Sequence, residues 1–437
     1  MNKPTKLAAL GTSVALSLCF IIVYGACNSI TAHRADVGMW HYEWESYIPL
    51  LTWFIVPYMS IDLFFAAAPF LCQTREELRN HSRRIVFAIL VAGIIFLLVP
   101  LKLVITRPDP TDWTGPIFRF LHGFDEPHNL FPSLHITLRA ILADLYARRT
   151  KGAWRVAVHV WFSLVGFSTI LVGQHHVPDV LGGFVLAAFC IYLFPTTKPD
   201  APGLAPCSPI GRYYVAGALA CFAATFIHWP VTAWFLYPAF SLTLVAAAYL
   251  KRGPIIFRKS GGKIPFSARL LLAPYLVGQY LSRRYFRREC AAWNEVTPRV
   301  WIGAHLNGNE AAEARRKGVA AVLDLTAECS EESSLRQLHY LNLPVLDLTP
   351  PSLDQLRQAV EFITRHESNG VVFVHCKIGY SRSAAAIGAY LLASGLAATV
   401  DEAAAQLRRA RPTIVIRPEA LAALHSFHAG LTISSRV

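Results

Sequence analysis

Eight predominantly apolar segments occupy the N-terminal part of the chain and limit what it can fold into. They span residues 7–28, 48–71, 85–106, 132–147, 156–174, 177–195, 213–229 and 231–250. A helix of about 20 apolar residues crosses the hydrocarbon core of a bilayer and satisfies its own backbone polar groups. The fourth segment contains Arg139 and Asp144, so hydropathy alone would miss it. The sequence therefore predicts a multi-pass α-helical membrane domain of about eight transmembrane helices at residues 1–253.

The net charge of +13 is concentrated in the loops beside these segments. Alternate loops hold most of the basic residues: Lys3, Lys6, Arg75, Arg79, Arg83, Arg84, Arg148, Arg149, Lys151, Arg155, Lys198, Arg212, Lys251 and Arg252. The opposite loops hold little beyond Arg34, Arg107 and Arg119. Because cytoplasmic loops are enriched in Lys and Arg, we expect both termini in the cytoplasm, in a bacterial inner (plasma) membrane. The charge pattern indicates membrane topology and no nucleic-acid partner.

Residues 254–289 form a basic segment between this domain and the rest of the chain. Its basic residues are Arg258, Lys259, Lys263, Arg269, Arg283, Arg284, Arg287 and Arg288, and its larger apolar residues are Phe257, Phe266, Leu270, Leu271, Leu272, Tyr275, Tyr280, Tyr285 and Phe286. Basic and aromatic residues together favour an interfacial segment on an anionic membrane surface. The alternative is a solvated connector that follows the charge rule for cytoplasmic loops.

Residues 375–383 read His-Cys-Lys-Ile-Gly-Tyr-Ser-Arg-Ser and carry the clearest chemical signal in the chain. The apolar residues 371–374 predict a buried strand before this loop, and residues 383–387 predict the first turn of a helix after it. Backbone N–H groups at the start of a helix make a cradle for an anion. The same field should lower the pKa of the Cys376 thiol.

Three further residues of this loop fit phosphate chemistry. Arg382 can bind two phosphoryl oxygens with its planar guanidinium group. Gly379 allows a backbone bend where a Cβ atom would clash. Ser383 can donate a hydrogen bond to the sulfur of Cys376 and ease its departure as a leaving group.

The pattern His-Cys-x5-Arg-Ser resembles the active-site loop of the cysteine-dependent protein tyrosine and dual-specificity phosphatases. The resemblance covers roughly residues 290–435, with family-like strands at 298–303 and 321–325 and a family-like later loop at 411–414. It implies an α/β domain at residues 290–437, which the predicted topology places in the cytoplasm. It also implies that Asp347, in the stretch 343–349, is the general acid.

The substrate of this domain is left open by the loop. Lys377 adds a second cation, as in the lipid- and inositol-phosphate branch of the family, which includes phosphatidylglycerophosphate phosphatases. Tyr380 instead resembles protein-directed members, so phosphoproteins stay an alternative class of substrate. We favour a lipid-borne phosphate because the domain is tethered to a bilayer. The nine cysteines show no Cys-x-x-Cys or Cys/His metal spacing, and we expect no metal and no cofactor.

A second group of polar residues gathers at one end of the apolar segments, near the predicted non-cytoplasmic face. Ionisable side chains at such places are costly and indicate function. His175 and Asp179 stand four apart, so a helix start would place them side by side. The carboxylate would orient the imidazole of His175 as a base or nucleophile. Lys102 and Arg107 could neutralise a phosphate, and His135 could protonate the leaving oxygen.

These residues resemble the three motifs of the type 2 phosphatidic acid phosphatase superfamily, over roughly residues 50–195, a family with a six-helix core. The resemblance implies a nucleophile at His175, its orienting carboxylate at Asp179 and an acid/base at His135. It assigns phosphate contacts to Lys102, Arg107 and Ser133.

Three departures from these motifs stand out: the first motif is two residues short, Leu134 replaces a glycine, and Thr169 replaces an arginine. Arg139, one turn after His135, is our hypothesis for the missing cation. The departures resemble the branch of inositol phosphorylceramide synthases and related phosphotransferases.

The sequence thus predicts a membrane-bound bifunctional phosphatase acting on membrane phospholipids, through a phosphohistidine and a cysteinyl-phosphate. Two alternatives stay open. One is a headgroup phosphotransferase whose substrate or product is trimmed by the attached phosphatase. The other is a membrane-anchored protein phosphatase in signalling.

Overall fold

The fold is taken from a computed structural model, which describes residues 3–196, 208–228 and 231–434. The chain divides into two compact units, Met1–Thr196 and Thr197–Val437. Lys198 of the predicted cytoplasmic set lies outside the described residues. The predicted bounds of the membrane domain at residue 253 and of the basic segment at residue 289 stay predictions.

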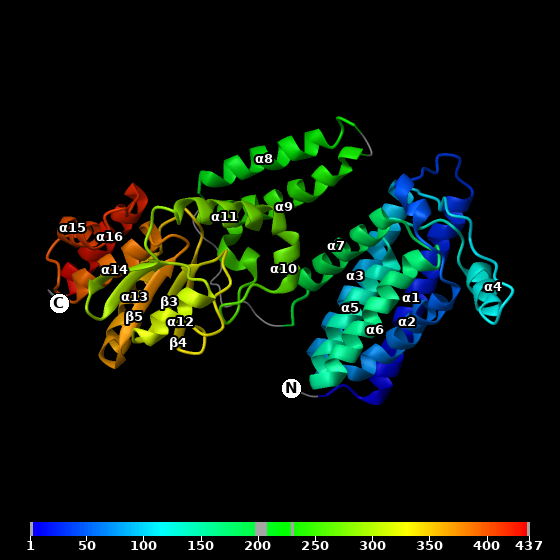
Figure 1. Ribbon diagram of the computed structural model, residues 1–437, viewed down its shortest axis with the longest axis horizontal. Helices are drawn as coiled ribbons and strands as arrows, with labels where there is room; N and C mark the ends of the chain where they lie inside the picture. The colour runs from blue at the N-terminus through cyan, green and yellow to red at the C-terminus, as the bar shows by residue number, and fades with distance from the viewer. Residues whose placement is uncertain (1–2, 197–207, 229–230, 435–437) are drawn as a thin grey trace. The chain divides into compact units, whose positions relative to one another are not determined.

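The first unit is a helical bundle. Its α-helices are α1 (Lys6–Ala32), α2 (Ile55–Ala67), α3 (Arg75–Leu98), α4 (Gly115–Phe124), α5 (Leu134–Arg149), α6 (Gly152–Leu171) and α7 (Val177–Leu193). Short 3-10 helices lie at η1 (Glu43–Tyr47), η2 (Thr52–Phe54) and η3 (Ala68–Leu71). Helices α1, α3, α5, α6 and α7 pack side by side around a core of Leu, Ile, Ala and Phe side chains (Figure 1).

Five helical stretches of the described residues are long and apolar enough to cross a membrane: Lys6–Ala32, Thr52–Leu71, Arg75–Leu98, Gly152–Leu171 and Val231–Phe257. Two shorter apolar helices are Val177–Leu193 and Ile210–Ala224. Helix α5 holds internal charges, of which Asp144 pairs with Arg84 at 2.9 Å. These helices are consistent with a membrane protein, whereas the number of about eight spans stays a prediction.

The second unit begins with helices that lead into an α/β domain. Helices α8 (Ile210–Ala224) and α9 (Leu236–Ala247) pack against each other, and α9 also contacts α11 (Ala273–Phe286) (Figure 1). The other elements here are η4 (Val231–Phe235), the π-helical turn η5 (Ala248–Arg252), η6 (Gly253–Phe257) and α10 (Phe266–Leu271).

A five-stranded mixed sheet forms the centre of the α/β domain, in the order β1-β2-β5-β3-β4. Its strands are β1 (Trp293–Thr297), β2 (Val300–Ala304), β3 (Val319–Thr326), β4 (His339–Val345) and β5 (Val371–Cys376). Only the β1–β2 pair is antiparallel among these strands. The carboxyl ends of β2, β3, β4 and β5 therefore meet at one edge, where α/β sheets bind their ligands.

Alternating side chains of β5 place the core on both faces of the sheet. Val372 and Val374 belong to the larger cluster, which also takes side chains from α13 (Leu353–His366), α14 (Ser381–Ala393), α15 (Val400–Ala410) and α16 (Pro418–Ser434). Val371 and Phe373 belong to the smaller cluster, with α12 (Gly308–Arg316). A last 3-10 helix is η7 (Glu367–Asn369). The strands predicted at 298–303, 321–325 and 371–374 and the helix predicted at 383–387 are confirmed within one or two residues.

Much of the basic segment 254–289 packs against the α/β domain. The backbone N–H of Glu331 donates to the carbonyl of Gly262 at 2.8 Å, and the N–H of Ile264 donates to Ser330 Oγ at 3.0 Å. In α11, Arg287 pairs with Glu310 of α12. The segment is thus held by specific contacts along its length.

Candidate active sites

The first candidate site lies at the carboxyl end of β5, where Cys376 ends the strand and α14 begins five residues later. The Cys376 sulfur lies 3.5 Å from Ser383 Oγ and is buried. Burial alone would raise the pKa of the thiol, but the Arg382 guanidinium and hydrogen bonds from Ser383 outweigh burial, so the pKa is lowered. A buried thiol with a lowered pKa beside an arginine is the environment of a nucleophilic cysteine.

The guanidinium group of Arg382 is held by a carboxylate that sequence reasoning did not single out. Glu328 accepts two hydrogen bonds from it, at 2.7 and 3.1 Å, and the carbonyl of Val345 accepts a third at 2.8 Å. A bidentate arginine–carboxylate pair fixes the plane of the guanidinium as well as its position. The arginine is therefore oriented beside Cys376 by residues from the ends of β3 and β4.

Asp347, the predicted general acid, is brought to the same place. Its carboxylate accepts a hydrogen bond from Arg382 at 3.0 Å and pairs with Lys377. Burial would raise the pKa of Asp347, but the charges of Arg382 and Lys377 lower it. The carboxyl is therefore held ionised in this arrangement, and a phosphate that binds both cations would release Asp347 to take up a proton.

The backbone of the cysteine loop packs against the end of β2 and is hydrogen-bonded by a buried arginine. Gly379 has φ +81°, and a Cβ atom there would lie 2.6 Å from the carbonyl carbon of Gly303. Glycine is required here by both the backbone conformation and the close approach. The buried Arg411 donates to the carbonyl of Ile378 at 2.9 Å and fixes the loop on its other side.

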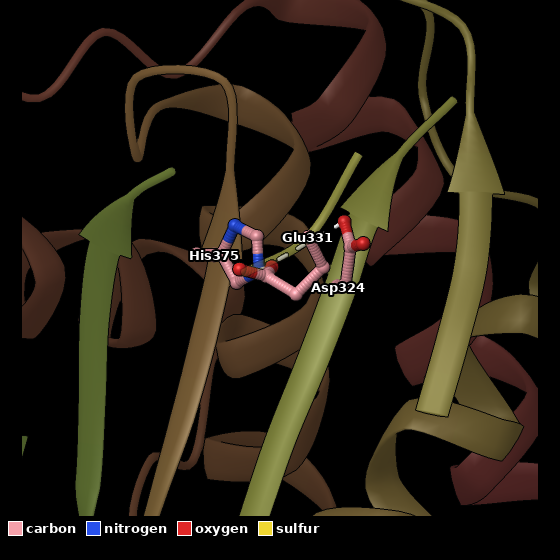
Figure 2. Close-up of side chains that lie close together, drawn as sticks. All are labelled: Asp324, Glu331 and His375. Carbon is pink, nitrogen blue, oxygen red and sulfur yellow. Dashed lines mark ion pairs between the residues drawn. The ribbon is translucent and has the colours of Figure 1, made fainter. Parts of the chain in front are cut away.

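Behind the loop lies a buried cluster of charges, in which Asp324, Glu331 and His375 point toward one another (Figure 2). His375 Nε2 lies 2.6 Å from Glu331 and 3.9 Å from Asp324. Burial alone would lower the pKa of His375, but the two carboxylates outweigh burial and raise the pKa from 6.5 to about 9. Lys259 Nζ lies 2.5 Å from Asp324. Two cations thus face two carboxylates in this cluster.

The second candidate site lies in the first unit, around a cavity of about 330 Å³. The predicted catalytic residues His135 and His175 both line it. His175 Nδ1 lies 3.7 Å from Asp179 Oδ2, which also accepts the backbone N–H of His176 at 2.8 Å. The ring of Tyr58 stacks on His135 with centroids 4.2 Å apart. The structure therefore brings the two histidines to one cavity and sets the carboxylate beside His175.

The residues predicted to contact phosphate, Arg107 and Ser133, are not among the described residues that line this cavity. Arg107 donates to the carbonyl of Asp125 and lies 3.7 Å from its carboxylate, and Asp125 lines the cavity. Ser133 caps α5, with its Oγ accepting the N–H of Ile136 at 3.2 Å. Asp125 and Tyr58 were not singled out from the sequence, since they lie outside the motif positions.

Lys102 and Arg139 are not among the described residues that line the cavity. Lys102 is exposed. The Arg139 guanidinium donates to the carbonyl of Phe162 and lies over the ring of Phe184 at 5.6 Å. The structure thus gives no support to Arg139 as the missing cation, and its role stays a prediction.

Family models match both parts of the chain. The dual specificity phosphatase catalytic domain matches residues 300–429, and the PAP2 superfamily matches residues 82–202. Cys376, Arg382 and Asp347 fall in the first match, and His135 and His175 fall in the second.

Several known proteins are similar to part of the chain. Human phosphatidylglycerophosphatase and protein-tyrosine phosphatase 1 is 30% identical over 177 residues, which are 38% of this chain and 88% of the relative. Phosphatidylglycerophosphate phosphatase PTPMT1 of Arabidopsis thaliana is 28% identical over 178 residues, which are 39% of this chain and 52% of the relative. The crystal structure of PTPMT1 in complex with PI(5)P has 25% sequence identity and a TM-score of 0.31, and the match covers 33% of this chain and 99% of that one.

Proposed function

Because this chain belongs to the dual specificity phosphatase family and carries a PAP2 superfamily domain, we propose that it is a membrane-bound enzyme with two phosphate-transferring sites. The observation that carries the proposal is the Cys376 thiol, whose pKa is lowered and which lies beside an arginine fixed by Glu328. This arrangement suits hydrolysis of a phosphomonoester through a cysteinyl-phosphate.

In the proposed reaction the Cys376 thiolate attacks phosphorus, and the bond from phosphorus to the ester oxygen breaks. Arg382 and Lys377 neutralise the phosphoryl oxygens of the bound substrate, and the Asp347 carboxylate that they release takes up a proton from water. Asp347 then gives this proton to the departing oxygen. Asp347 then takes a proton from water, which attacks phosphorus and releases phosphate and the thiolate. Ser383 donates to the sulfur as it leaves. Catalysis of this kind depends mainly on positioning and on charges placed in advance.

We propose a lipid-borne phosphate as the substrate of the Cys376 site. The Arabidopsis relative is named a phosphatidylglycerophosphate phosphatase, and the human relative is named both a phosphatidylglycerophosphatase and a protein-tyrosine phosphatase. Lys377 also supplies a second positive charge next to Arg382, and two positive charges match the two negative charges of a phosphomonoester headgroup. Phosphoproteins are the alternative, and a phosphopeptide in the assay below separates the two.

The outward face of α11 supports membrane docking of segment 254–289. Val277, Tyr280, Leu281 and Tyr285 are exposed, and the basic residues Arg284 and Arg288 are exposed beside them. The spacing of three and four places the five side chains that belong to α11 on one face of the helix, and Arg288 follows just after the helix ends. An aromatic and basic face of this kind favours the surface of an anionic membrane.

For the membrane domain we propose transfer of a phosphoryl group through a phosphohistidine at His175, with Asp179 orienting the imidazole and His135 as acid/base. Hydrolysis of a lipid phosphate is the first candidate reaction. Transfer to an alcohol is the second, and it is favoured by Thr169 and Leu134, where the motif of the hydrolytic family has arginine and glycine. We place this site on the periplasmic face of a bacterial inner membrane and the Cys376 site in the cytoplasm.

The test compares the purified wild type with Cys376→Ser and His175→Ala. Phosphate release is measured from vesicles containing phosphatidylglycerophosphate or phosphatidic acid and from a phosphotyrosine peptide, each with and without inositol or glycerol. We expect Cys376→Ser to abolish release from one lipid and His175→Ala to abolish a different activity. Release from the peptide alone would contradict the lipid proposal, and lipid hydrolysis that survives Cys376→Ser and His175→Ala together would contradict both sites.

A further inference from the structure

The loop that carries Asp347 is held by a side chain from outside the sheet and its covering helices. Tyr249 donates its phenolic O–H to the carbonyl oxygen of Asp347 at 2.9 Å, and the Tyr249 side chain is only 1% exposed. Tyr249 lies in the π-helical turn η5, directly after α9. Single π-helical turns are uncommon and occur frequently at functional sites.

Aromatic contacts tie this tyrosine to the neighbouring helices. The ring of Tyr214 in α8 stacks on Tyr249 with centroids 5.2 Å apart, and the ring of Tyr275 in α11 meets Tyr214 edge-on at 5.7 Å. The Tyr249 ring therefore packs on α8, which in turn contacts α11, and the Tyr249 hydroxyl joins these helices to the Asp347 loop.

The side chain of Asp347 is held from the same direction through Lys377. Lys377 Nζ pairs with the Asp347 carboxylate and donates to Gln279 Oε1 at 2.7 Å, with Ser282 Oγ at 3.5 Å. Gln279 and Ser282 both belong to α11. Backbone and carboxylate of the acid are thus both restrained by helices that precede the α/β domain.

The backbone beside Asp347 needs such restraint. Leu348 has φ +61° although it is not a glycine, and its side chain is 46% exposed. A left-handed conformation in a non-glycine residue costs free energy and persists only where surrounding contacts impose it. The hydrogen bond from Tyr249 restrains the carbonyl of Asp347, the residue directly before Leu348.

We infer that Tyr249 and Gln279 are positioning residues for the general acid, so that the helices preceding the α/β domain complete the phosphatase site. The inference rests on the proposed roles of Cys376 and Asp347. It assigns α9 and α11 a part in catalysis as well as in attachment. Protonation of the leaving oxygen therefore depends on how these helices are packed.

Leaving-group dependence tests the inference in the full-length protein. The assay uses a His175→Ala background, so that phosphate release reports the Cys376 site, with benzyl phosphate and para-nitrophenyl phosphate as soluble probes. Benzyl alcohol leaves poorly and needs a proton from the acid, whereas nitrophenolate leaves well without one. Loss of one hydrogen bond of about 1.4 kcal/mol corresponds to about a tenfold change in rate. We expect Tyr249→Phe to lower kcat/KM for benzyl phosphate about tenfold and kcat/KM for para-nitrophenyl phosphate less than about twofold. The ratio kcat/KM is compared because it reports departure of the leaving group and excludes the later hydrolysis of the cysteinyl-phosphate, in which Asp347 serves both substrates alike.

Tyr237→Phe is the matched control, because Tyr237 in α9 also donates to a backbone carbonyl, but to that of Leu270 in α10 and not to the loop of Asp347. It should change neither rate by more than about twofold. Gln279→Leu should repeat the selective loss with benzyl phosphate. In an Asp347→Asn background, Tyr249→Phe should have no further effect, because its partner function is already gone.

Three results would overturn the inference: equal slowing of both probes by Tyr249→Phe, an effect no larger than that of Tyr237→Phe, or full additivity with Asp347→Asn. Failure of the proposed function is a separate result. It would appear as para-nitrophenyl phosphate hydrolysis that Cys376→Ser leaves unchanged.

Discussion

Lys259 provides the sharpest test of how the basic segment is joined to the α/β domain. Its ammonium group lies 2.5 Å from Asp324 Oδ2, 2.8 Å from the carbonyl of Thr326 and 3.1 Å from Thr326 Oγ1. Lys259 is 1% exposed and Asp324 is fully buried. Replacing Lys259 by methionine keeps the side-chain length but leaves the carboxylate without its closest cation. Removal of one partner of a buried ion pair costs about 3–5 kcal/mol.

The assay is the temperature at which half of the Cys376-dependent hydrolysis of para-nitrophenyl phosphate is lost, with the full-length protein in detergent micelles. A domain of this size loses about 2–4 °C per kcal/mol, so Lys259→Met should lower this temperature by roughly 6–20 °C. Lys263→Met is the control, because Lys263 lies four residues after Lys259 in the same segment and is exposed. Adding Asp324→Asn should recover part of the loss, since the buried charge is removed. A loss no larger than that of Lys263→Met would refute the reasoning.

Three further predictions concern the charged groups of the two sites. Since the pKa of the Cys376 thiol is lowered by Arg382, Arg382→Ala should move the midpoint of iodoacetamide alkylation to higher pH, and an unchanged midpoint would contradict this cause. His375, with its pKa raised from 6.5 to about 9, contributes stability that is complete below about pH 6.5 and lost as the pH rises through about 9. The half-inactivation temperature should therefore fall between about pH 7 and 10, and His375→Asn should flatten this fall. Asp125→Asn removes the carboxylate charge 3.7 Å from Arg107 and leaves the carbonyl that Arg107 also bonds, so it should weaken the hold on Arg107 and lower phosphate release from phosphatidic acid in a Cys376→Ser background; no change there would argue against the Asp125 carboxylate as an anchor of that arginine.

The cysteine loop could be predicted from the sequence because its chemistry is local. A strand, a tight loop and a helix start follow one another within 371–387, and Cys376 and Arg382 need no distant residue to share a cradle. The positive φ of Gly379 and the contact between Cys376 and Ser383 fit that expectation. The helical fold of the N-terminal part was likewise predictable, since long apolar segments have few alternatives.

Residues brought in by tertiary packing could not be predicted in this way. Glu328 lies 54 positions from Arg382, and Tyr249 lies 98 positions from Asp347. No periodicity or motif marks either partner. In the sequence Lys259 is one of many basic residues of segment 254–289 and nothing distinguishes it. Its burial against Asp324 depends on the folded sheet. Arg139 shows the converse, because helical spacing placed it near His135 but its side chain turns toward Phe162.

The most direct test of two phosphate-transferring sites is the chemical identity of the covalent intermediates. The full-length enzyme would be quenched while it hydrolyses radiolabelled lipid phosphates, and the labelled peptides would be mapped. The account predicts a label on Cys376 that is lost in Cys376→Ser and an acid-labile label on His175 that is lost in His175→Ala. Steady release of phosphate with no label on Cys376 in any substrate would contradict the central claim.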